Sequence, residues 1–140
     1  MAELNRSMQR EIIMTSLYQI FIYEANKIEY DIKEVIKSSL EVENNFINEI
    51  VYGVLEKREE LDNVANKYLK NWSIDRLGKT DQAIIRMAIY EIMYTDTPNI
   101  VCINEAVELA KAYSDDKVKS MINGILDSIS QSIDNGKDIE

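Results

Sequence analysis

Apolar residues recur along this chain with the spacing of an α-helix in almost every segment. In the first segment Ile13, Leu17 and Ile20 fall on one face, and Ile12 and Phe21 widen the apolar stripe. Similar stripes begin near residues 31, 46, 61, 81, 103 and 117. The pattern therefore predicts an all-α protein of about seven helices.

Several helix boundaries can be predicted from single residues. The carboxylate of Asp31 can cap the second helix, and the fourth stripe continues as far as Trp72. Gly78 suits a left-handed helix terminus. Gly53 lies inside the third helix, where a glycine costs about 1 kcal/mol relative to alanine, so we expect close packing at that position.

The helices fall into two groups. The segment 73–78 is typical of a joint, and the helix that follows it, 81–94, is apolar on nearly all sides, as expected for the centre of a bundle. We therefore expect one domain over 1–140, made of two packed helical-bundle lobes. The N-terminal lobe would span 5–73 and the C-terminal lobe 74–134, with a polar tail at 135–140.

Composition excludes several kinds of chemistry. The chain has 140 residues, no His and one Cys, which removes imidazole catalysis, His-containing metal sites and an intrachain disulfide. The acidic run from Glu56 to Asp62 is best interpreted as a solvated helix face. We expect no enzymatic activity, no catalytic residue, no metal and no cofactor. No segment approaches the roughly 18 apolar residues that span a bilayer, so we expect a cytoplasmic protein with no membrane partner.

The basic residues are few but unevenly placed in a chain of net charge −9. Arg6 and Arg10 lie one helical turn apart, and a second group (Lys67, Lys70, Arg76 and Lys79) surrounds the joint. Tyr18 and Tyr68 stand near these cations, and aromatic rings among cations can stack single-stranded bases. From the residues alone, solvated lysines and half-buried tyrosines remain the favoured interpretation.

Five local patterns change that weighting. They are Arg6-x3-Arg10-x6-Leu17-Tyr18, Phe46-x4-Val51-x-Gly53-Val54, Leu77-x3-Asp81-Gln-Ala-Ile-Ile-Arg86-Met-Ala-Ile-Tyr90-Glu91, Val101-Cys-Ile-Asn104-Glu105-Ala-Val-Glu-Leu-Ala-Lys111 and Met121-Ile-Asn123-Gly124-Ile-Leu-Asp127. In this order and spacing the chain resembles the bacterial NusB transcription antitermination family over residues 6–130.

The resemblance implies a two-lobed helical protein without enzymatic activity. Such a protein binds the boxA RNA of ribosomal RNA leader transcripts together with NusE, a protein of the small ribosomal subunit, and acts indirectly with other Nus factors and RNA polymerase. By the resemblance, Arg6 and Arg10 would contact phosphates, Tyr18 and Tyr68 would contact bases, and Lys70 would add charge.

The resemblance also suggests where NusE binds. Asp81 and Arg86, at the start of the central helix, would face it, although an ion pair of Arg86 with Glu91 or Asp81 competes with that role. A monomer or a homodimer is expected, since some members of the family self-associate.

The chain departs from the family at its start, where many members carry a denser arginine cluster and this sequence has Ser7, Met8 and Gln9. Fewer phosphate contacts lower affinity for RNA and flatten its salt dependence. The hypothesis is that the protein binds boxA weakly alone and depends on NusE. The alternative is a helical protein–protein adaptor with little RNA binding of its own.

Overall fold

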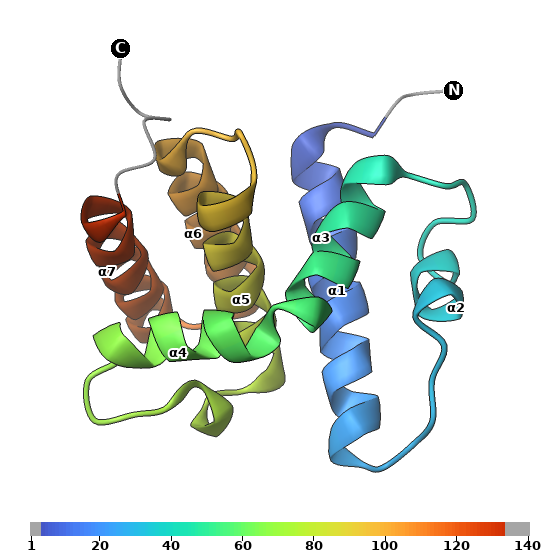
Figure 1. The fold of residues 1–140 in the computed structure, drawn as a ribbon, viewed down its shortest axis with the longest axis horizontal. Helices are drawn as coiled ribbons and strands as arrows, with labels where there is room; N and C mark the ends of the chain where they lie inside the picture. The colour runs from blue at the N-terminus through green and yellow to red at the C-terminus, as the bar shows by residue number, and fades with distance from the viewer. Residues whose placement is uncertain (1–3, 134–140) are drawn as a thin grey trace.

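The computed structural model describes residues 4–133 and contains seven α-helices, one 3-10 turn and no strand in that range (Figure 1). This confirms the all-α prediction. The predicted polar tail at 135–140 lies outside the described residues. The elements are α1 (Arg6–Ala25), α2 (Ile32–Lys37), α3 (Asn45–Glu56), α4 (Arg58–Tyr68), η1 (Ile74–Arg76), α5 (Lys79–Tyr94), α6 (Asn99–Tyr113) and α7 (Asp116–Ser132).

Helix α5 holds the molecule together because it packs against α1, α3, α4, α6 and α7. Figure 1 shows α1, α2 and α3 on one side of it and α6 and α7 on the other, with α4 crossing below toward α7. Every residue from Gln82 to Ile89 is buried, which confirms the predicted central helix. The division into lobes at 73/74 stays a prediction.

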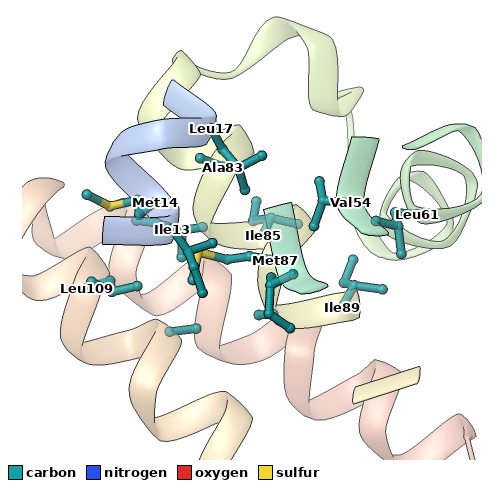
Figure 2. Close-up of a cluster of buried hydrophobic side chains, with 14 of the residues drawn as sticks. Ile13, Met14, Leu17, Val54, Leu61, Ala83, Ile85, Met87, Ile89 and Leu109 are labelled. Atoms are coloured by element: carbon teal, nitrogen blue, oxygen red, sulfur yellow. The ribbon is translucent and has the colours of Figure 1, made fainter. Parts of the chain in front are cut away.

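The hydrophobic core is continuous across both groups of helices. Figure 2 shows Met14 of α1, Val54 of α3, Leu61 of α4, Met87 of α5 and Leu109 of α6 meeting in one cluster. Burial of this surface is the main stabilising contribution to the fold. Within residues 4–133, no helix is long and apolar enough to cross a membrane.

Two predicted features of the sequence are confirmed in detail. Asp31 caps α2, because its carboxylate accepts a hydrogen bond of 2.9 Å from the backbone N–H of Lys33. The backbone of Gly53 lies directly against the ring of Tyr90, and a Cβ at position 53 would overlap that ring. Close approach of α3 to α5 therefore explains a glycine inside a helix.

Three predicted boundaries are wrong. Helix α4 ends at Tyr68, so Trp72 stands in the next loop, 55% exposed. Gly78 is the residue before α5, with an ordinary φ of −62°, and not a left-handed terminus. Helix α6 begins at Asn99 rather than near 103, because Pro98 precedes it with a φ of −55° that suits the start of a helix.

Candidate nucleic-acid interface

A cavity of about 700 Å³ opens where the end of α4 and the loop after it meet α7. Its walls are mostly apolar side chains, among them Leu77, Val118, Met121 and Ile125. Two aromatic residues, Tyr68 and Trp72, also line it. A space of this size, with aromatic rings at its edge, is large enough to receive a planar group such as a nucleobase.

The charge around this cavity is positive. Lys70, Arg76 and Lys117 line it and are exposed, whereas none of its lining residues within the described chain is acidic. The whole protein carries a net charge of −9. The cavity is thus a local cationic surface on an acidic protein, as an anionic ligand would require.

The loop that presents Lys70 and Trp72 is fixed at both ends. Leu69 and Ile74 are buried at 7% and 1% exposure, and the Asn66 side chain accepts a hydrogen bond of 2.8 Å from the backbone N–H of Ile74. Between them Asn71 adopts a φ of 66°, the left-handed conformation that asparagine tolerates better than most residues. The turn therefore points its two neighbours outward.

Arg10, which was expected to contact phosphate, is buried at 4% exposure. Its guanidinium donates two hydrogen bonds to the Glu91 carboxylate, at 2.7 and 2.8 Å, and lies 3.4 Å from Glu105. Burial lowers the pKa of Arg10, but the hydrogen bonds and negative charge of Glu91 outweigh it and raise that pKa above its ordinary value. The geometry fits a residue that fixes the start of α1 better than one that touches RNA.

Arg6 is placed differently, because it is exposed at the first turn of α1. Its guanidinium lies 3.9 Å from the centre of the Phe46 ring and donates to the Gln9 side chain at 2.7 Å. These contacts restrain the side chain and leave part of it open to solvent. Tyr18, further along α1, is 39% exposed.

The two residues expected to face NusE are also in different environments. Asp81 is half-buried and accepts a hydrogen bond from the Ser114 hydroxyl. Arg86 is buried at 5% exposure and donates to Asp62 at 2.7 and 2.9 Å. The expected ion pair of Arg86 with Glu91 or Asp81 is wrong: Arg86 pairs with Asp62 of α4, and the Glu91 carboxylate is held by Arg10.

The structure brings together only part of the predicted RNA site. Tyr68 and Lys70 share the cavity, whereas Arg6 and Tyr18 lie on α1, whose start is well separated from the end of α4 (Figure 1). Two further lining residues, Trp72 and Lys117, are not identified by the sequence pattern, because the apolar spacing predicts Trp72 on a helix face and Lys117 is 47 positions after Lys70. Lys70 and Lys117 line the same cavity only because α4 packs on α7.

An all-α fold with a cationic, aromatic-lined cavity defines a helical binding protein with the surface expected for single-stranded nucleic acid. The model of the NusB family matches residues 7–131. The chain therefore belongs to the NusB family.

Curated relatives and solved structures agree with that assignment. The transcription antitermination protein NusB of Bacillus pumilus is 38% identical over 129 residues, covering 90% of this chain and 95% of its own. That of Bacillus subtilis is 37% identical over 134 residues, covering 94% and 98%. Both relatives carry the name of a transcription antitermination protein and not of an enzyme.

Among solved structures, NusB of T. maritima superposes with a TM-score of 0.79 at 29% identity, covering 93% of each chain. A crystal structure of antitermination factors NusB and NusE in complex with dsRNA matches with a TM-score of 0.75 at 23% identity, covering 91% of this chain and 97% of that one. This second likeness shows the shared fold.

Proposed function

We propose that this protein is a transcription antitermination factor that binds the boxA RNA of ribosomal RNA operon leader transcripts together with NusE. It would act in the cytoplasm and contact the other Nus factors and RNA polymerase indirectly. The observation that carries the proposal is the cavity between α4 and α7. It combines Tyr68, Trp72 and three exposed cations on a protein of net charge −9.

The RNA contacts divide between two surfaces. At the cavity, Tyr68 and Trp72 stack on bases while Lys70 and Lys117 neutralise phosphates. On α1, Arg6 contacts a phosphate and Tyr18 a base, since both side chains are exposed. Arg10 acts as a positioning residue, because its guanidinium is committed to Glu91.

NusE binds near the start of α5 in this proposal. The half-buried Asp81 offers a carboxylate there, while Arg86 positions α4 against α5 through Asp62. NusE and RNA are the partners found with the NusB chain of the crystal complex that shares this fold.

The test is fluorescence anisotropy of labelled boxA RNA at ~0.15 M salt, with and without NusE and against a scrambled RNA. Preference for boxA that strengthens with NusE is the expected result. Lys70→Glu should weaken binding strongly, because it reverses a charge at the cavity. Lys33→Glu, on the distant helix α2, makes the same charge change and should have little effect.

The main alternative is an adaptor with little RNA binding of its own. Equal, feeble binding to both RNAs with NusE present would favour it, and Arg6→Glu would then leave activity intact. Arg6 is the residue to reverse on α1, because reversing Arg10 would bury a second negative charge beside Glu91 and disrupt the fold.

A further inference from the structure

A groove lies between α1 and α6, away from the cationic cavity. Its volume is about 280 Å³, and residues of both helices line it, including Met8 and Glu11 of α1 and Glu105, Glu108 and Tyr113 of α6. Small-molecule sites are usually larger, about 300–1,000 Å³. The groove is therefore sized for one or two anchoring side chains of a larger partner.

The groove is negatively charged. Three carboxylates line it, and none of its lining residues in the described chain is basic. Glu105 accepts a hydrogen bond of 2.8 Å from the Ser7 hydroxyl, and Glu11 accepts one from the Tyr113 hydroxyl. The buried Arg10 reaches Glu105 only at 3.4 Å and is already paired with Glu91. Negative charge consequently remains at the groove.

Apolar surface surrounds these carboxylates. Met8 is 49% exposed and Tyr113 is 45% exposed, although both line the groove. Val101, 38% exposed, precedes Glu105 by one helical turn and so extends the same face of α6. Methionine is flexible and polarizable, which suits a surface that receives apolar side chains of a partner.

The negative charge of the groove indicates what kind of partner can bind there. An RNA phosphate would be repelled by the three carboxylates, and a second copy of this chain would bring a further net charge of −9. A cationic partner with apolar side chains fits both features. We propose that the groove between α1 and α6 is a docking site for a basic amphipathic segment of a protein partner. Its apolar side chains would contact Met8 and Tyr113, and its Lys or Arg would pair with Glu105 and Glu108.

A designed peptide tests this proposal directly. The probe is a fluorescent peptide of about 14 residues with Leu and Lys at helical spacing, long enough for marginal helicity. Two controls are the same pattern with Glu in place of Lys and a scrambled peptide of the same composition. The patterned basic peptide should bind the full chain at ~0.15 M salt, and both controls should bind at least five-fold more weakly.

Variants locate the binding site. Glu108→Lys and Met8→Ser change exposed positions and should each weaken binding about five-fold without loss of the fold. Glu29→Lys changes charge equally at an exposed position outside the groove and should leave affinity unchanged. In NMR spectra, the peptide should shift the amides of residues 7–11 and 105–113.

Three results would overturn the proposal. One is equal binding of the patterned and scrambled peptides, and another is equal weakening by Glu108→Lys and Glu29→Lys. The third is a dimer in sedimentation that Glu108→Lys dissociates, which would make the groove an interface between two copies. None of these measurements uses RNA, so the proposal can fail while the proposed RNA binding stands, and the reverse.

Discussion

The guanidinium of Arg10 in α1 and the carboxylate of Glu91 in α5 form a bidentate ion pair, with hydrogen bonds of 2.7 and 2.8 Å. Their side chains are 5% and 2% exposed. Such parallel N–H···O bonds fix direction as well as distance. The pair therefore sets the position of the first turns of α1 on the central helix, and with it the position at which the Arg6 side chain is exposed.

Removing one member of this pair should be costly. Arg10→Ala leaves Glu91 buried without its main counter-charge, and we expect a loss of about 3–5 kcal/mol in the free energy of unfolding. Replacing both, as in Arg10→Met with Glu91→Leu, should recover most of that loss, since an apolar pair of similar volume needs no desolvated charge. Urea unfolding of the three proteins measures both effects. A double variant as unstable as Arg10→Ala would show that the loss of stability does not come from the unpaired charge of Glu91.

Gly53→Ala should destabilise the protein even though alanine is the better helix former. The added methyl group would overlap the ring of Tyr90, so either the ring or α3 must move. We expect a net loss of about 1–3 kcal/mol, as for other overpacked sites. In a Tyr90→Leu background the penalty should shrink, because the shorter side chain leaves room. Thermal unfolding of the parent and the three variants in this cycle tests the coupling.

Helical periodicity is enough to predict the fold, whereas the ion-pair partners of the charged residues can be identified only in the structure. The stripes predicted α1 through α7 because apolar spacing is a local property of the chain. The partners of Arg10 and Arg86 are 81 and 24 positions away and depend on how α1 and α4 pack on α5. The spacing of Trp72 continues the apolar stripe of α4 and so predicts it on that helix. Nothing in the apolar pattern marks the turn at Asn71, between the end of the helix and Trp72.

Stability should fall in acid partly through Glu24. Two hydrogen bonds from Arg58, at 2.6 and 3.0 Å, hold the pKa of Glu24 below its ordinary value, with a further contribution from the Tyr30 hydroxyl against a raising effect of partial burial. The unfolded chain therefore takes up this proton more readily than the folded one. The stabilisation is complete above the ordinary pKa of 4.5 and is lost as pH falls through and below it.

The corresponding variant is Glu24→Gln. Its urea midpoint should lie below that of the parent at neutral pH and approach it between about pH 5 and pH 3. Glu29→Gln is the matched control, because Glu29 is exposed and forms no ion pair within residues 4–133. A difference from the parent that stays constant over this range would contradict the assignment to Glu24.

Aromatic stacking at the cavity should be measurable ring by ring. Tyr68→Ala and Trp72→Ala should each cost about 1–3 kcal/mol of boxA binding, as for stacked bases elsewhere. Tyr52, 45% exposed on α3 and outside the cavity, supplies the control substitution Tyr52→Ala. Quenching of Trp72 fluorescence on titration with unlabelled RNA gives a second readout, because it is the one tryptophan of the chain.

The salt dependence of RNA binding should separate phosphate contacts from base contacts. Each phosphate neutralised on a single strand contributes about −0.7 to the slope of log K against log salt concentration. Lys70→Ala and Lys117→Ala should each flatten the slope by about that amount, whereas Trp72→Ala should lower affinity and leave the slope unchanged. Lys33→Ala should change neither quantity. If Lys70→Ala and Lys117→Ala changed the affinity and the salt slope no more than Lys33→Ala does, the RNA phosphates would lie elsewhere. The start of α1, with Arg6, would then be the surface to examine.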